Sequence, residues 1–252
     1  MSHVEAVISG IVQGITEFLP ISSSGHLVIL HHYFGFKEPQ LLFDLFLHIG
    51  TLFAVVVYFW RDIIKLFTTQ RKLLLLIVIG TIPTVLIGYY FKDTLESFFT
   101  DIKLVGIMLI ATALFLFTAD WAGRRKYVST QMSGLTWLKS LVIGIVQGIA
   151  IIPGISRSGS TISSAVLLKV DKAQAIRFSF LLSIPAIIGA LVLKLASAAG
   201  GPSITTNMLI GAFFAFIFGL GAIYLLIKCV VNSNLKFFGF YCLVAGGVIL
   251  AL

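Results

Sequence analysis

The chain has 252 residues, of which 58% are hydrophobic and 11% charged, and its formal net charge is +8. Soluble domains carry about 25% charged residues, so this composition argues against a soluble enzyme, a disordered chain or a nucleic-acid-binding protein. An excess of Lys and Arg in a membrane protein is typical of its cytoplasmic loops. The sequence therefore predicts an all-α polytopic membrane protein.

The first hydrophobic region, residues 4–36, is broken by Glu17, Pro20 and a polar run that ends at His26. Each half is too short to cross a bilayer, which takes about 20 apolar residues. Irregular backbone at membrane depth is tolerated where it is buried in protein or lines a cavity. We therefore expect a re-entrant helix–loop–helix hairpin here. A second one is expected at 135–170, where Pro153, Gly154 and another serine-rich run interrupt the apolar sequence.

Six uninterrupted apolar segments are expected to span the membrane. They cover residues 41–60, 73–91, 104–120, 178–195, 208–227 and 237–252. Basic loops alternate with neutral or acidic ones, so the positive-inside rule places the first, third and fifth connections in the cytoplasm and both termini outside. The basic residues of these connections are Arg61, Lys65, Arg71, Lys72, Arg124, Arg125, Lys126, Lys228 and Lys236.

The two hairpins belong to an internal repeat. The hexapeptide Gly10–Ile15 recurs letter for letter at Gly144–Ile149, and Phe43–Gly50 aligns with Phe178–Pro185 at nearly the same offset. Repeat one then covers residues 1–126 and repeat two 127–252, each with one hairpin and three spans. Because three is an odd number of spans, the second repeat has the opposite orientation in the membrane. In proteins with such inverted repeats, the broken helices of the two repeats meet near the midplane and form the binding site.

Glycines recur at a spacing of four in both hairpins. Such small residues allow close helix packing, and they also suit a homodimer contact, so both interpretations stay open. The glycines are Gly10, Gly14, Gly144 and Gly148.

The first hairpin carries ionisable side chains inside an apolar region. Gln13 and Glu17 are four residues apart and share a helical face. His26 begins the next half-helix. Ionisable groups within a membrane are costly, so Glu17 and His26 are candidate functional residues. For His48, inside the first expected span, a structural role is favoured.

The second hairpin holds Arg157, the only charge in a long apolar stretch. A buried Arg needs an anion, which is either a ligand or Glu17 in an ion pair. Arg157 is flanked by Ser and Gly residues, and a helix starts near Thr161. This combination is typical of a phosphate-binding site formed by backbone amides at a helix N-terminus. A carboxylate, a histidine and this cradle favour phosphoryl transfer. The alternative is an inverted-repeat transporter or flippase for an anionic lipid.

Two motifs carry a family resemblance that covers essentially the whole chain. Gln13-Gly-Ile-Thr-Glu17, followed by Phe-Leu-Pro-Ile-Ser-Ser-Ser-Gly-His26, together with Pro153-Gly-Ile-Ser-Arg-Ser-Gly-Ser-Thr161, resembles the undecaprenyl-diphosphate phosphatases, also called bacitracin resistance proteins. The resemblance implies hydrolysis of undecaprenyl diphosphate to undecaprenyl phosphate at the outer face of the bacterial inner membrane. This reaction recycles the lipid carrier of peptidoglycan synthesis, and the resemblance also implies a divalent cation, Mg²⁺ or Ca²⁺.

The resemblance also implies roles for individual residues. Glu17, Ser23, His26 and Arg157 are expected to be catalytic, with Glu17 also binding the cation. Gln13 stands where many members have Glu, which puts in doubt any mechanism that needs two carboxylates there. Either Ser23 attacks with His26 as base, or His26 attacks directly or activates water. The expected substrate-binding residues are Gln13, Ser22, Ser24, Gly25, Gly154, Ser156, Ser158, Gly159 and Thr161.

Overall fold

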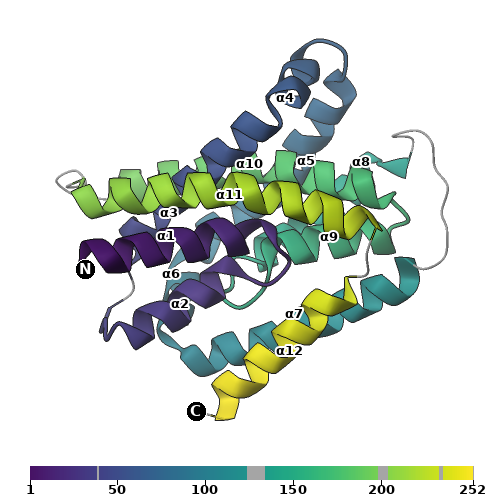
Figure 1. Ribbon diagram of the computed structural model, residues 1–252. Coiled ribbons are helices and arrows are strands. Elements are labelled where there is room, and N and C mark those ends of the chain that lie inside the picture. Colours follow the sequence, from purple (N-terminus) through teal and green to yellow (C-terminus); the bar gives the residue numbers. More distant parts are fainter. Residues whose placement is uncertain (39, 124–133, 198–203, 233–234, 252) are drawn as a thin grey trace.

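The computed structural model describes residues 1–38, 40–123, 134–197, 204–232 and 235–251 (Figure 1). All regular secondary structure within these ranges is helical. The helices are α1 (His3–Phe18), α2 (Ser23–Tyr33), α3 (Leu41–Tyr58), α4 (Trp60–Phe67), α5 (Arg71–Tyr90), α6 (Lys92–Ser97), the 3₁₀ turn η1 (Phe98–Thr100), α7 (Ile102–Gly123), α8 (Trp137–Ile149), α9 (Arg157–Leu167), α10 (Lys172–Ser197), α11 (Thr206–Asn232) and α12 (Lys236–Ala251).

Among the described residues, five helices are long and apolar enough to cross a membrane, namely α3, α5, α7, α10 and α11. They correspond to the first five spans expected from the sequence. The sixth expected span coincides with α12, which has 16 residues. At 1.5 Å per residue it is about 24 Å long, short of the hydrocarbon thickness of about 30 Å. The fold class of an all-helical, multi-pass membrane protein is confirmed, and the sixth crossing stays a prediction.

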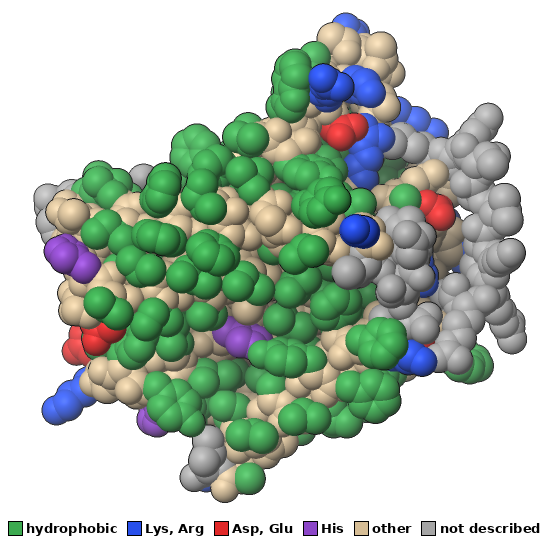
Figure 2. All heavy atoms as spheres, viewed as in Figure 1, with side chains coloured by type: hydrophobic (Ala, Val, Ile, Leu, Met, Phe, Trp, Pro, Cys, Tyr) green, Lys and Arg blue, Asp and Glu red, His purple; other side chains and the backbone are tan. Residues whose placement is uncertain are grey.

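The surface supports a membrane environment. Large apolar side chains such as Leu75, Leu114 and Val192 are more than half exposed, and hydrophobic side chains cover most of the face in Figure 2. A contiguous apolar surface of this kind is typical of contact with lipid. Lys and Arg side chains gather around the α4 end (Figure 2). The expected basic residues Arg124, Arg125 and Lys126 lie outside the described residues.

The two interrupted regions form helix–turn–helix pairs, α1 with α2 and α8 with α9. The residue before Pro20, Leu19, is extended and ends α1, as expected for a residue that precedes proline. The hydroxyls of Ser22 and Ser156 then cap α2 and α9 by accepting hydrogen bonds from the Gly25 and Gly159 amides. The sequence breaks therefore coincide with the turns.

Each pair packs against the other half of the chain. Helix α1 runs along α11, and α8 runs along α5 (Figure 1). A methyl group added to Gly14 would lie 2.7 Å from the Ala215 carbonyl oxygen, and one added to Gly144 would collide with the Gly80 carbonyl. The expected close packing at these glycines is confirmed within one chain, and the homodimer contact stays a prediction.

The two turns meet in the interior. The Ser158 hydroxyl donates to the Leu19 carbonyl at 3.0 Å. Thr112 of α7 holds the second turn, because its hydroxyl donates to the Gly154 carbonyl at 3.0 Å and accepts from the Ser156 amide at 3.1 Å. Gly154 has a φ of +95°, and a side chain there would also press on α7. Helix packing therefore places the polar ends of α1 and α9 opposite each other.

Candidate active site

Glu17 is the centre of the polar group at the two turns. It lies in the last turn of α1 and is 6% exposed. Its Oε1 accepts a hydrogen bond from Arg157 Nη2 of α9. Its Oε2 accepts the Ser23 hydroxyl at 2.5 Å and the Gln13 side-chain amide at 3.1 Å. A buried carboxylate is tolerated only when it is paired and hydrogen-bonded, and both of its oxygens are satisfied here.

Ser23 owes its position to a strained neighbour. Ser22 has a φ of +69°, in the left-handed region that residues other than glycine rarely adopt. His26 Nδ1 lies 2.6 Å from the Ser22 carbonyl oxygen. A carbonyl can only accept, so Nδ1 is the donor. This hydrogen bond, together with the cap on Gly25, holds the turn and directs Ser23 toward Glu17.

The structure does not bring His26 to Glu17. The His26 ring stacks on Tyr241 of α12, with centroids 5.6 Å apart, and its Nε2 lies 2.7 Å from the Tyr241 hydroxyl. Both ring nitrogens are thus engaged away from the carboxylate. The sequence predicted that Glu17, Ser23, His26 and Arg157 share one site. The structure places Ser23 and Arg157 each in direct contact with Glu17 and turns His26 toward α12.

A cavity of about 310 Å³ opens beside this group. Glu17, Ser23 and Arg157 line its polar end, and the rest of its wall is mainly apolar, including Leu27, Leu45 and Ile187 among others. Arg157 Nη1 is buried and has no hydrogen-bond partner in the described part of the chain. A buried guanidinium nitrogen without a partner is costly, so this arm is available to an anionic ligand.

The other expected substrate-binding residues divide into two sets. Ser24 and Ser156 line the cavity. Thr161 instead bonds to Ser179, with the two hydroxyl oxygens 2.6 Å apart, inside the contact between α9 and α10. Within the described residues, the cavity wall does not include Gln13, Ser22, Gly25, Gly154, Ser158, Gly159 or Thr161, which cap the helices or pack the two turns and their supporting helices.

The structure adds cavity residues that were not expected from the sequence. His48 and Asp44, one turn apart on α3, line the wall, and Lys92 and Glu96 contribute from α6. The sequence signal for the α3 pair was that both side chains are ionisable inside an expected span. They also belong to the Phe43–Gly50 segment, which aligns with Phe178–Pro185 of the second repeat. Glu5, the other carboxylate of α1, lies at the start of that helix, where it forms a capping box with Ser2.

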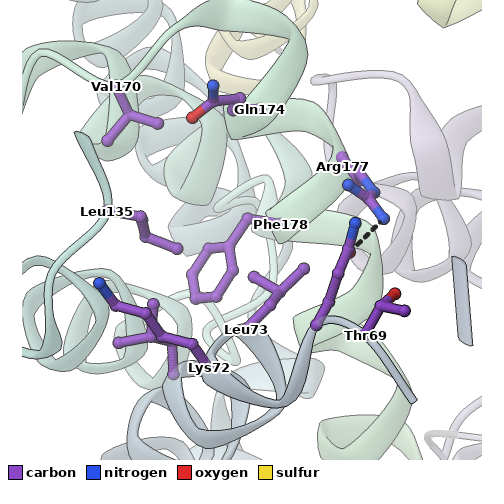
Figure 3. Close-up of a pocket in the computed structure, with 10 residues that line it drawn as sticks. Thr69, Lys72, Leu73, Leu135, Val170, Gln174, Arg177 and Phe178 are labelled. Atoms are coloured by element: carbon purple, nitrogen blue, oxygen red, sulfur yellow. Dashed lines mark hydrogen bonds between the residues drawn. The ribbon is translucent and has the colours of Figure 1, made fainter. Parts of the chain in front are cut away.

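A second hollow of about 200 Å³ lies near the other end of α5 and α10 (Figure 3). Arg177 lies at its edge, donates to Gln70 Oε1 at 2.8 Å and pairs with Asp62. Leu76 lines this hollow and Thr84 lines the first, so the two are separated by about 12 Å along α5. Asp62 compensates the charge of Arg177, as Glu17 does that of Arg157, and among the described residues each guanidinium keeps one buried nitrogen without a partner, Nε in Arg177 and Nη1 in Arg157.

The residues present do not form a resident metal site. In the described part of the chain, no group of three or more His, Cys, Asp or Glu side chains is placed to hold an ion. Both oxygens of Glu17 are already occupied, one of them by a cationic guanidinium. Mg²⁺ prefers several oxygen ligands and is commonly bound through substrate phosphates as well as carboxylates. The expected role of Glu17 as metal ligand is therefore not built into this geometry.

Comparison with known proteins identifies the family. The family model described as "Bacitracin resistance protein BacA" matches residues 6–248. The chain belongs to the BacA family. A BacA relative from Desulfatibacillum aliphaticivorans, named undecaprenyl-diphosphatase, is 42% identical over 278 aligned residues, covering 99% of this chain and 98% of the relative.

Relatives from other organisms carry the same name. Undecaprenyl-diphosphatase 4 of Bacillus thuringiensis subsp. konkukian is 42% identical over 256 residues, covering 100% of this chain and 98% of the relative. Undecaprenyl-diphosphatase of Korarchaeum cryptofilum is 39% identical over 269 residues and is covered in full, as is this chain. The resemblance carried by the two motifs is thus confirmed for the BacA family.

Proposed function

We propose that the chain hydrolyses undecaprenyl diphosphate to undecaprenyl phosphate and inorganic phosphate. This activity recycles the lipid carrier for peptidoglycan synthesis and confers bacitracin resistance, in line with the family and the names of the relatives. The observation that carries the proposal is the hydrogen bond from Ser23 Oγ to Glu17 Oε2, 2.5 Å long, at the wall of a cavity that also exposes Arg157. A hydroxyl that donates to a carboxylate is prepared to lose its proton during attack.

The proposed reaction has two steps. Glu17 Oε2 takes the Ser23 proton while Ser23 Oγ bonds to the terminal phosphorus, and the anhydride P–O bond breaks to release undecaprenyl phosphate. Water then attacks the phosphorus of the phosphoserine, the Ser23 Oγ–P bond breaks and Oγ regains its proton from Glu17. Inorganic phosphate leaves as H2PO4⁻, which carries both protons of the water. Arg157 Nη1, buried without a partner among the described residues, donates to the phosphate oxygens and stabilises the negative charge. Ser24 and Ser156 add polar contacts from the cavity wall.

The membrane arrangement belongs to the same proposal. The pairs α1–α2 and α8–α9 are re-entrant, α12 completes six spans, and the cavity and both termini face the outer side of the bacterial inner membrane. The apolar part of the cavity wall, which includes Leu27, Leu45 and Ile187, accommodates the start of the lipid chain. Undecaprenyl diphosphate is a substrate that needs this combination of an anion site and an apolar wall.

The divalent cation enters, in this proposal, as part of the substrate. Mg²⁺ or Ca²⁺ accompanies the diphosphate, because the protein side chains at Glu17 do not form a resident site. A chelator then lowers activity by changing the substrate, while leaving the fold unchanged. Thermal unfolding of the detergent-purified protein is expected to be the same with and without EDTA, whereas phosphate release is expected to fall when EDTA is added.

The decisive experiment measures phosphate release from undecaprenyl diphosphate by the detergent-purified protein. Ser23→Ala removes the attacking hydroxyl and is expected to lower kcat by at least about 100-fold, as is typical for loss of a reacting group. Arg157→Lys keeps a positive charge but loses the planar donor pair, and we expect kcat/KM to fall by about 10- to 100-fold. Thr68→Ala deletes an exposed hydroxyl at the α4 end and serves as the matched control.

Absence of phosphate release from folded, monodisperse wild-type protein would contradict the phosphatase proposal. An assay of lipid flipping in vesicles would then test the transporter alternative. Ser23→Ala could instead keep full activity and the pH profile of the wild type. The nucleophile would then be another group, such as water.

A further inference from the structure

His48, for which the sequence favoured a structural role, lies in the wall of the active-site cavity. Its side chain is 27% exposed, compared with 5% for that of Glu17. Its Nε2 lies 3.6 Å from Glu17 Oε2, the same oxygen that accepts the Ser23 hydroxyl. His48 therefore lies next to the serine–carboxylate pair and is open to a ligand in the cavity.

The two ring nitrogens of His48 indicate its charge. Nδ1 lies 2.8 Å from the Asp44 backbone carbonyl oxygen. A carbonyl oxygen can only accept, so Nδ1 carries a hydrogen. Nε2 faces a carboxylate oxygen, which also can only accept when it is ionised. Only the doubly protonated imidazolium offers an N–H to both neighbours, so a positively charged His48 fits between the Asp44 carbonyl and Glu17.

Two cations thus flank one carboxylate. Arg157 bonds to Glu17 Oε1, and His48 faces Oε2. Glu17 is the anion that holds both cations beside the cavity when no other anion is bound. A diphosphate has more negative charge and more acceptor oxygens than a carboxylate, so it competes effectively for the Arg157 and His48 donors.

We propose that His48 is a second cationic arm of the substrate site, which binds the terminal phosphate together with Arg157. Arg157 Nη1 reaches the phosphate while Nη2 keeps its hydrogen bond to Glu17 Oε1. When His48 Nε2 turns to the phosphate, Glu17 Oε2 keeps its hydrogen bond from Ser23 and loses one positive neighbour. It then accepts the Ser23 proton at the moment when the substrate is in place. This inference rests on the proposed phosphatase activity. It adds His48 to the residues that bind the substrate, and only the protonated side chain of His48 would do so.

The charged surroundings of His48 are defined by the helices that meet at the cavity. Glu17 faces it from α1, Arg157 follows on α9, and Asp44 lies one turn away on α3. Around the same wall, α6 contributes Lys92 and Glu96, and α2 places His31 against Asp44, with His31 Nε2 3.7 Å from Asp44 Oδ1. The remaining described charged residues of the helices packed on α3 lie toward the helix ends, as Arg177 of α10 and Lys228 of α11 do. Because several of these groups titrate, the pH dependence must be assigned with His48 variants.

The test measures kcat and KM for undecaprenyl diphosphate from about pH 5.5 to about pH 9, a range that brackets the usual titration of histidine. Wild-type KM is expected to rise as the pH rises, because His48 loses its proton and its charge. His48→Gln is expected to raise KM by about 10-fold at the acidic end, corresponding to one lost charge-assisted hydrogen bond, and to abolish the rise. His48→Lys should keep KM low to higher pH, because lysine stays protonated there.

Two controls make the outcome specific. His32→Gln alters an exposed histidine on α2, and it is expected to leave both KM and its pH profile unchanged. Inorganic pyrophosphate serves as a probe that needs no turnover: it should raise the unfolding temperature of the wild type at acidic pH, and raise that of His48→Gln much less.

The possible results are distinguishable. If the wild type releases phosphate but His48→Gln keeps the wild-type KM and pH profile, His48 does not bind the substrate. The inference about His48 then fails, while the proposed phosphatase function stands. If the wild type releases no phosphate, the proposed function fails, and the pyrophosphate measurement still decides the inference. Loss of the pyrophosphate effect in His48→Gln supports anion binding by His48, and an unchanged effect overturns it.

Discussion

At the scale of single residues, the position of Ser23 depends on its strained neighbour Ser22. Ser22 adopts a φ of +69°, a conformation that costs about 1–3 kcal/mol for a residue other than glycine. The hydrogen bond from His26 Nδ1 to the Ser22 carbonyl offsets part of this cost, and Tyr241 holds the far side of the ring. We therefore propose that His26 acts on Ser23 through the backbone, as a positioning residue.

This role predicts a particular order among His26 variants. His26→Ala releases the Ser22 carbonyl, and phosphate release is expected to fall by about 10- to 100-fold, which corresponds to about 1.4 to 2.7 kcal/mol of lost positioning. His26→Asn offers an amide N–H close to the position of Nδ1 and should recover part of the activity. Equal inactivity of the two variants in the same assay would instead support direct acid–base chemistry by His26.

At the scale of helices, the site depends on two close crossings. Helix α8 reaches α5 only because Gly144 and Gly80 allow the backbones to touch, and α1 reaches α11 at Gly10 and Gly211 in the same way. These contacts hold the first helix of each pair at a fixed depth, and hence hold Glu17 opposite Arg157. Small residues at such crossings allow the packing that holds membrane helices together.

We expect Gly144→Ala to destabilise the protein. Its added methyl group would collide with the Gly80 backbone, and overpacking of this kind costs about 1–3 kcal/mol. Thermal unfolding in detergent measures the effect. Gly221→Ala is the matched control, because a methyl group there meets no atom of the described residues within 4 Å. Equal unfolding temperatures for the two variants would argue against a tight crossing of α5 and α8.

At the scale of the whole molecule, the basic cluster around α4 and the candidate site lie toward opposite ends. Lys65, Arg71 and Lys72 belong to the end of the molecule formed by α4 and the start of α5, where the second hollow lies (Figures 2 and 3). The active-site cavity is lined by the later half of α5, at Thr84 and Gly88. If the basic end faces the cytoplasm, as the positive-inside rule predicts, the cavity lies in the outer half of the membrane.

Cysteine labelling on intact cells tests this orientation. The background is the double variant in which Cys229 and Cys242, the two cysteines of the chain, are replaced by serine. A membrane-impermeant maleimide should label Lys37→Cys, at an exposed position between α2 and α3, without permeabilisation. Lys65→Cys should react only after the membrane is opened. The reverse pattern would place the cavity on the cytoplasmic side.

Much of the architecture followed from the sequence because its signals are local. The length of an apolar segment decides whether it can span, and a proline or a polar run decides where a half-helix ends, with no reference to distant residues. The turns at Pro20 and Gly154, and the five long spans, were predictable for this reason. The Glu17–Arg157 ion pair was one of the two alternatives that the sequence left open, because a buried Arg needs an anion but its identity does not follow from spacing.

Only the tertiary structure decided which histidine faces Glu17. The sequence placed His26 three residues after Ser23 and so favoured it, yet its ring is held by Tyr241, 215 residues farther along the chain. His48 reaches Glu17 because α3 packs beside α1, and Thr161 turns from the cavity because α10 supplies Ser179. The direction of a side chain depends on the helix that packs against it, and sequence spacing along one helix contains no information about that neighbour.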